Sequence, residues 1–346
     1  MPVVRIPNQS TTQHYLRPYT HHGVDLHMQG SHAVADCPFC AHAGKFSVDM
    51  QSGLWRCFTC GGGRETGGGN ALVFVQLLHA AGLRVSDDAF CTEVSTSRRL
   101  DSPDTVRAWG IVRSPVLSQS WLVPGYRVNG EISQLYRRVR AQDSSGEWVW
   151  RLMPTPGVWP VGRAHALHLP SDFDPARPVV VVCEGPWDGL ALWEVNRKVW
   201  GDANIIAVPG CTTWRDEWTE WCKGKEVVLL YDSDHPKEHT GKVWRAGYDG
   251  MQRVAKRLNG HAKSVRWLKW GEEGYDPTKP DKWDIRDELS GMPDTPLLMV
   301  DRYQILEELL TKVEDVPSEW FAKSTDTGSK QRVPTIEPIE CSTWVE

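Results

Sequence analysis

Two Cys-x-x-Cys pairs constrain what this chain can fold into more than any other feature of the sequence. Cys37 and Cys40 form the first pair, and Cys57 and Cys60 form the second. Each pair presents two thiolates from one tight turn, and two such turns complete a tetrahedron around Zn²⁺. Two apolar, strand-prone pieces with a glycine-containing turn lie between the pairs. The sequence therefore predicts a small zinc ribbon holding one structural Zn²⁺, with the nearby His42 as a solvated side chain.

The composition is that of a globular protein with a hydrophobic core. The 346 residues are 40% hydrophobic and 24% charged. The formal net charge of −5 offers no overall attraction for nucleic acid, but Arg137, Arg138 and Arg140 concentrate positive charge in one short segment. The sequence shows no apolar run of transmembrane length and no signal-peptide pattern, so we expect no membrane partner and a cytoplasmic location.

Changes of pattern divide the chain into five predicted segments. An apolar stretch of helix-forming residues at 70–81 follows the cysteines and is expected to pack on them. Strand-like pieces, two of them joined by a turn signal, come next, and alternating strands and helices follow. The predicted parts are a zinc-ribbon domain at 1–81, a linker at 82–101, a basic β-rich subdomain at 102–177, an α/β domain at 178–312 and a flexible tail at 313–346.

Continuous apolar runs in the α/β segment are typical of strands buried on both faces. Because such runs alternate with stretches of helix-forming residues, the predicted fold class is α/β, with a parallel sheet and flanking helices. We expect strands at 178–183, 205–208, 226–231 and 264–268, and helices at 186–196, 214–222 and 247–258.

Acidic side chains follow two of these expected strands. Glu184 comes directly after the first, and Asp232 and Asp234 come after the strand at 226–231. The carboxyl ends of parallel strands form the ligand-binding edge of such sheets, so we expect the three side chains to lie together. Clustered carboxylates suit Mg²⁺ or Mn²⁺. Metals held in this way bind a triphosphate and activate an attacking hydroxyl group in phosphoryl transfer.

Other residues near these acids have two interpretations each. Gly185 and Asp188 fit a tight turn from strand to helix, and the alternative interpretation of Asp188 is a favourable charge at a helix N-terminus. Lys282 and Asp284 belong to a later segment that adds acidic and basic groups, although that segment alone also fits a capped surface helix.

The acidic motifs resemble the Toprim domain shared by primases, topoisomerases and some nucleases and recombination proteins. The family's signature glutamate matches Glu184, and its Asp-x-Asp matches Asp232 and Asp234. The resemblance implies that these three residues are catalytic and hold Mg²⁺ or Mn²⁺, and that Glu184 assists deprotonation of the attacking hydroxyl. It also implies that Asp284 binds metal and Lys282 binds nucleotide.

Two departures from the Toprim pattern are visible. Residues 235–245 are inserted before the Ala-Gly pair that opens the next helix, and Trp283 separates Lys282 from Asp284.

The order of parts is similar to that of phage-type primases, in which a zinc ribbon and a basic subdomain precede Toprim. The resemblance implies synthesis of short RNA primers from NTPs on single-stranded DNA. In that family the basic strands hold template and nucleotide, a role that would fall here to Arg137, Arg138, Arg140 and Arg151. The sequence contains no phosphate-binding loop of the Gly-x-x-x-x-Gly-Lys-Ser/Thr type, so we expect the helicase partner to be a separate protein.

Two other functions fit parts of the sequence. A Toprim nuclease would use the same acids to hydrolyse phosphodiesters, but the zinc ribbon argues against it. A non-catalytic DNA clamp of the recombination-mediator type also combines a four-cysteine module with Toprim. The long, arginine-containing segment between the cysteines and Glu184, together with the complete acidic set, favours the primase.

Overall fold

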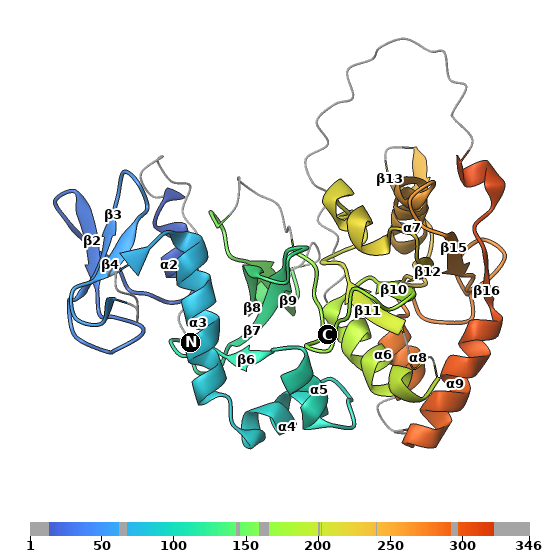
Figure 1. The fold of residues 1–346 in the computed structure, drawn as a ribbon, viewed down its shortest axis with the longest axis horizontal. Helices are drawn as coiled ribbons and strands as arrows, with labels where there is room; N and C mark the ends of the chain where they lie inside the picture. The colour runs from blue at the N-terminus through green and yellow to red at the C-terminus, as the bar shows by residue number, and fades with distance from the viewer. Residues whose placement is uncertain are drawn as a thin grey trace, which may run out of the picture.

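The computed structural model describes residues 14–61, 68–142, 146–158, 166–199, 201, 203–239, 241–291 and 297–321. Three parts follow one another along the longest axis of the molecule: a module of short strands, a central four-stranded sheet and an α/β part (Figure 1).

The N-terminal module is an antiparallel sheet whose strands follow each other in chain order. Asn70 caps its last helix, because the side chain accepts a hydrogen bond from the N–H of Val73 at 3.1 Å. The elements are α2 (Arg17–His21), β1 (His27–Gln29), β2 (His32–Ala35), β3 (Phe46–Asp49), β4 (Trp55–Cys57), β5 (Gly68–Gly69) and α3 (Ala71–Val85).

The segment predicted as a linker at 82–101 is instead largely helical. Helix α3 runs into it, and α4 (Asp88–Ser97) fills its second half. Phe90, Cys91 and Val94 recur on one face of α4 and are buried, and Asp87 caps the helix through the N–H of Phe90. The prediction was wrong because most residues of this segment are polar, and the few apolar ones that form the buried face of α4 give only a weak helical pattern.

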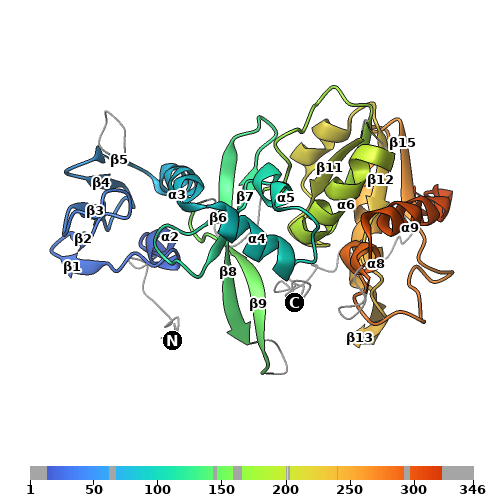
Figure 2. The same cartoon turned by 90° about the horizontal axis from the view of Figure 1, so that it is seen from below.

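The central sheet is antiparallel and in chain order: β6 (Val112–Arg113), β7 (Trp121–Tyr126), β8 (Ile132–Gln142) and β9 (Trp148–Pro154). Helix α5 (Pro103–Ala108) precedes it and begins at the predicted Ser102-Pro103 signal, with the Ser102 hydroxyl accepting the N–H of Asp104 at 3.1 Å. Strands β8 and β9 extend beyond the rest of the sheet and project from the molecule (Figure 2).

The α/β part is built on a five-stranded sheet of order β11-β10-β12-β15-β16. The four predicted strands pair in parallel, whereas the edge strand β16 is antiparallel to β15, so the sheet is mixed rather than wholly parallel. The strands are β10 (Val179–Cys183), β11 (Ala203–Ala207), β12 (Glu226–Leu230), β15 (Ser264–Leu268) and β16 (Val313–Asp315).

Helices cover both faces of this sheet. Helices α6, α8 and α9 lie below it in the view of Figure 1, and α7 lies above it. The remaining elements are α6 (Pro186–Val199), α7 (Ala246–Leu258), α8 (Ile285–Ser290), α9 (Met299–Thr311), the 3-10 helices η2 (Asp216–Cys222) and η3 (Ser318–Phe321), and the strands β13 (Lys237–His239) and β14 (Lys242–Trp244).

The flexible tail predicted from residue 313 therefore begins too early. Strand β16 and helix η3 belong to the folded part, and Trp320 is buried against Tyr248 and Trp267. The segment was too short and too polar for its strand to be recognised, since an edge strand pairs on one side only. The rest of the predicted tail lies outside the described residues.

The N-terminal module and the central sheet share one hydrophobic core. Phe74 and Leu78 of α3 lie in the same cluster of buried residues as Leu122 and Leu135 of the central sheet. Polar contacts join the same elements, because the Gln76 side-chain amide donates to the carbonyl of Ile132 at 3.0 Å.

Candidate functional site

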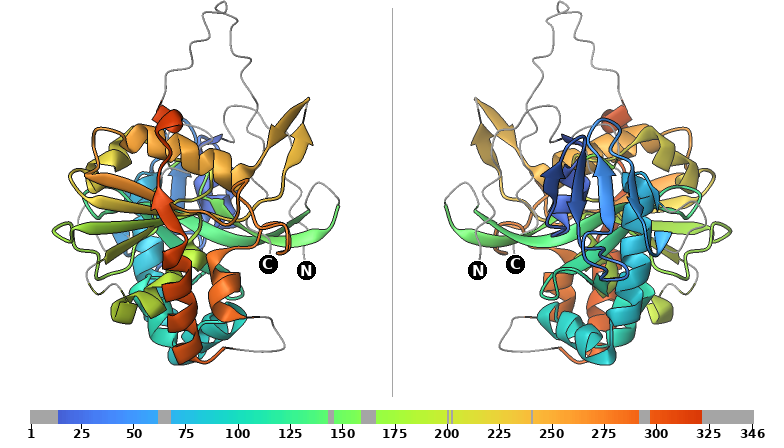
Figure 3. Two further views of the ribbon diagram at one scale, coloured as in Figure 1. Left: turned by 90° about the vertical axis from the view of Figure 1, so that its right-hand side faces the viewer. Right: turned by 90° about the vertical axis from the view of Figure 1, so that its left-hand side faces the viewer.

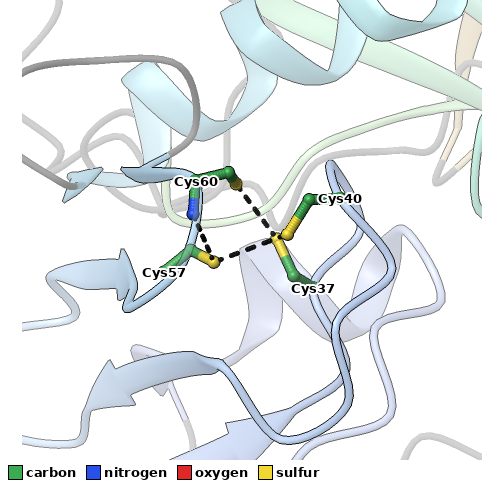
Figure 4. Close-up of side chains that lie close together, drawn as sticks. All are labelled: Cys37, Cys40, Cys57 and Cys60. Atoms are coloured by element: carbon green, nitrogen blue, oxygen red, sulfur yellow. Dashed lines mark hydrogen bonds between the residues drawn. The ribbon is translucent and has the colours of Figure 1, made fainter.

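The four predicted zinc ligands lie together at one end of the N-terminal module. Their sulfur atoms are all within 4.8 Å of one another, and the Sγ–Sγ distances are 3.7 Å for Cys37–Cys60 and 3.8 Å for Cys40–Cys57. Figure 4 shows the four side chains pointing toward a common centre. Four thiolate ligands at this spacing fit a structural Zn²⁺.

The surroundings of Cys57 favour its thiolate form, whereas burial raises the pKa of Cys37. Burial raises the pKa of Cys57, but hydrogen bonds from the N–H groups of Cys60 and Thr59, together with the thiols of Cys37 and Cys60, outweigh it and lower the pKa to about 6. The imidazole of His42 contacts the carbonyl of Cys40 and lies outside the cysteine cluster.

The second candidate site is acidic and lies at the carboxyl ends of β10 and β12. These neighbouring strands pair with Cys183 opposite Leu230, so Glu184 and Asp232 leave the sheet from adjacent positions. Glu184, Asp232 and Asp234 are 1%, 8% and 3% exposed, which is unusual for carboxylates. Asp234 is oriented by the N–H of Gly247, which donates to its Oδ2 at 2.6 Å.

The buried acids perturb one another electrostatically. Burial raises the pKa of Asp232 well above its usual value, and the charges of Glu184, Asp188 and Asp284 raise it further. Burial also raises the pKa of Asp234, against the effect of the Gly247 N–H. Mutual repulsion of this kind is relieved when a cation binds, and oxygen donors suit a hard divalent ion.

The acids are nevertheless more widely spaced than the cysteines. Among the residues that the structure describes, the cysteines form the one group of three or more potential metal-ligating side chains whose donor atoms all lie within 4.8 Å.

The segment 281–291 reaches the acidic centre through tertiary contacts. The N–H of Ser233 donates to the carbonyl of Trp283 at 2.9 Å. This bond places Asp284, the residue after Trp283, beside Asp232. Asp284 is the N-cap of α8 and accepts the N–H of Asp287 at 2.6 Å. Burial raises the pKa of Asp284 to about 6, although Arg286 lowers it. Asp284 thus combines both sequence interpretations, since it caps a helix and also faces the acids.

Gly185 and Asp188 form the turn that leads from β10 into α6. The carbonyl of Gly185 accepts the N–H of Gly189 at 3.0 Å. Asp188 is 4% exposed and its carboxylate is the acceptor for the N–H of Arg286 at 3.4 Å. Asp188 therefore connects α6 with α8 beside the metal-site candidates.

Lysine side chains stand on the solvent side of the acidic centre. Lys237, in the inserted segment, pairs with Asp281 at 2.8 Å, and the positive charges of Lys237 and Lys282 both lower the pKa of Asp234. Lys282 has a left-handed backbone conformation, with φ of 65°. The insertion forms the antiparallel pair β13–β14, which projects to the same side of the molecule as β8–β9 (Figure 3).

The four candidate arginines divide between the two faces of the β8–β9 pair, because alternate residues of a strand point to opposite sides. Arg138 and Arg140 share one face. Arg137 and Arg151 share the other, where the charge of Arg137 contributes, after burial, to lowering the pKa of His21.

Two arginines that sequence reasoning did not select lie beside the acids. Arg286 is 8% exposed and pairs with Asp284 at 3.0 Å and Asp287 at 3.7 Å. Arg98 is 5% exposed, and its pKa is lowered by burial and by the charges of Arg286 and Arg138. Arg286 belongs to the acidic segment already noted at 282–287, whereas Arg98, from the supposed linker, carries no local signal.

Comparisons with known proteins give structural likenesses only. No protein-family model matches the sequence, and no curated protein matches it. The zinc-binding and RNA polymerase domains of the Aquifex aeolicus primase are 16% identical, with a TM-score of 0.44 over 89% of this chain and 87% of that one. The RNA polymerase domain of Mycobacterium tuberculosis primase DnaG is 14% identical, with a TM-score of 0.46 over 70% and 84%.

A third similar structure is a DnaG primase catalytic domain bound to single-stranded DNA. It is 13% identical, with a TM-score of 0.45 over 70% of this chain and 80% of that one. The chain is thus similar to DnaG-type primase domains, but at TM-scores below 0.5 the likeness leaves the activity to be argued from the site itself.

Within the described residues, every helix falls short of the length and apolar character that a membrane span requires.

Proposed function

We propose that this protein is a DNA primase, which joins NTPs into short RNA primers on a single-stranded DNA template. The observation that carries the proposal is the buried acidic set at the ends of β10 and β12. An arginine-bearing strand pair lies on the adjoining sheet, and that sheet shares its core with a four-cysteine module. Nucleotidyl transfer needs both parts: carboxylates that hold a divalent cation, and positive groups that hold phosphates.

Glu184, Asp232 and Asp234 are assigned to hold Mg²⁺ or Mn²⁺ in a Toprim-type site, with Asp284 as a further ligand. When bound, the metal neutralises triphosphate charge and lowers the pKa of a 3′-hydroxyl. Glu184 is assigned to assist deprotonation of that hydroxyl. Arg286 balances the negative charge of Asp284 and thereby keeps the acidic segment in place.

The basic groups are assigned to the substrates. Arg137, Arg138, Arg140, Arg151 and Lys282 would bind template and NTP phosphates, and the zinc module would contact a short word of the template. We expect the protein to work with a separate replicative helicase, because its sequence contains no phosphate-binding loop of the Gly-x-x-x-x-Gly-Lys-Ser/Thr type.

The decisive experiment compares wild-type protein with Asp232→Asn on single-stranded DNA templates, with labelled NTPs and Mg²⁺ or Mn²⁺. The isosteric change removes one metal-binding charge, and we expect templated RNA products to disappear while zinc content and circular dichroism stay unchanged. Asp216→Asn is the matched control, because that carboxylate is exposed in η2 and pairs with Arg257 at the surface.

Each outcome separates the candidate functions. RNA synthesis that persists in Asp232→Asn would show that Asp232 is not an essential metal ligand. Shortened template without RNA products would indicate a nuclease. DNA binding with neither product would indicate a non-catalytic clamp.

A further inference from the structure

One face of the β8–β9 pair alternates arginine with tryptophan. Arg140 lies opposite Trp150 in the antiparallel register, and Gln142 lies opposite Trp148. Arg138 is two residues before Arg140 and therefore points to the same side. Trp148, with 48% of its surface exposed, and Arg140 lie toward the projecting end of the pair (Figure 2).

The guanidinium groups on this face stack on the indole rings. Arg138 lies 3.7 Å from the ring centre of Trp121 and 4.1 Å from that of Trp150, so it is held between two aromatic rings. Arg140 lies 5.6 Å from the ring centre of Trp150. Burial lowers the pKa of Arg138 to about 10, against the effect of Glu93, so this side chain stays charged at neutral pH.

The stack continues inward to the acidic centre. The rings of Trp121 and Trp187 are 6.1 Å apart, and Arg98 lies 4.0 Å from the ring centre of Trp187. Trp187 is in the first turn of α6, three residues after Glu184. Trp121, Trp187 and Arg98 are only 2%, 5% and 5% exposed, so this inner part of the row is buried and supports Arg138 from beneath the exposed face.

We propose that this face, defined by Arg138, Arg140, Trp148 and Trp150, is a base-stacking platform that holds a single-stranded nucleic acid near the acidic centre. The assignment rests on the proposed function and deepens it, because it selects one face of the strand pair for the template. Exposed indole rings stack on any nucleobase, and the intervening arginines meet the phosphates, which is how proteins bind single strands without sequence preference.

The opposite face differs in character. It presents Val149 and Met153 beside Arg151, and its other arginine, Arg137, is directed toward the zinc module, near His21. Among its described residues this opposite face therefore has positive charge but no exposed aromatic ring. Variants on it serve as controls for variants on the proposed platform.

The test measures binding of a fluorescent oligothymidylate by anisotropy, without NTPs or metal. We expect Trp148→Ala to weaken binding about tenfold, with little change in the salt dependence, because a stacking contact is lost. Trp148→Phe restores most of the affinity, since a ring is present again. We expect Arg140→Ala to weaken binding and to reduce the slope of log K against log salt by about 0.7, because one phosphate contact is lost on a single strand.

Met153→Ala removes an exposed apolar side chain from the opposite face of β9, and Arg84→Ala removes an exposed charge from α3; both retain wild-type affinity. The proposal is overturned if Trp148→Ala binds as wild type, or if Arg151→Ala loses as much affinity as Arg140→Ala. The binding assay does not depend on catalysis. If the wild-type protein made no primers, the proposed function would be rejected, but the effect of each variant on oligothymidylate binding could still be measured.

Discussion

Gly189 lies directly against the indole ring of Trp109. A Cβ atom added at Gly189 would stand 2.2 Å from Cη2 of that ring, and Trp109 is 1% exposed and packed in the core between α5 and α6. Helix α6, which begins two residues after Glu184, can therefore pack closely against Trp109 only because residue 189 has no side chain.

Gly189→Ala is expected to destabilise the protein by about 1–3 kcal/mol, because overpacking outweighs the helix propensity gained by alanine. Chemical unfolding followed by circular dichroism measures the change. In Trp109→Phe the ring is smaller, so the loss caused by Gly189→Ala should shrink in that background, as a double-mutant cycle would show. A Gly189→Ala variant that is more stable than the wild type would contradict the prediction, because it would mean that the Trp109 ring can shift to make room for the added Cβ.

Loss of zinc is expected to affect more than the N-terminal module. Cys57→Ser should remove one equivalent of Zn²⁺ and lower the free energy of unfolding by about 5 kcal/mol or more, because the metal supplies folding energy and the module shares its core with the central sheet. Elemental analysis and thermal unfolding measure the two effects. His42→Ala, beside the cluster, should keep its zinc; if it does not, the ligand set needs revision.

His168 should make stability depend on pH. It is 1% exposed, its Nδ1–H donates to the carbonyl of Pro124 at 2.8 Å, and its backbone pairs with Ala207 of β11. Burial lowers the pKa of His168 from 6.5 to about 4. The unfolded state therefore binds the additional proton between these values, and stability that is complete above pH 6.5 decreases as the pH falls toward 4.

The expected loss from His168 at pH 4 is up to about 3 kcal/mol. His168→Asn keeps a donor for Pro124 and does not titrate, so its stability should vary less between pH 7 and pH 4 than that of the wild type. Urea unfolding at several pH values provides the comparison, which is needed because His21 and His22 also have lowered pKa values. Parallel pH profiles for the two proteins would exclude His168 as a source of the dependence.

Glu194 and Arg302 form a buried ion pair between α6 and α9. Their side chains are 2% and 3% exposed, the N–O distance is 3.4 Å, and Glu194 also accepts the N–H of Ser102 at 3.0 Å. Glu194→Ala should cost about 3–5 kcal/mol, because it removes one charge of a buried pair and a cap of α5. Equilibrium unfolding tests this, with the exposed Glu217→Ala in η2 as the control; equal stability of the two variants would contradict the network.

The sequence by itself determined those parts of the protein whose structure depends on residues close together in the chain. The two cysteine pairs identified the metal cluster because each pair sits in one tight turn. Continuous apolar runs identified β10 and β12, since a strand covered on both faces has few polar residues. Those signals need no knowledge of distant contacts.

Only the tertiary structure decided which distant residues meet. The placement of Asp284 beside Asp232 depends on the bridge from Ser233 to Trp283. The placement of Arg98 over Trp187 depends on the packing of α4 on α5 and of α5 on α6. An edge strand and an amphipathic helix with few apolar residues, such as β16 and α4, were missed for the same reason. Their stability comes from partners far along the chain, and a local pattern does not contain those partners.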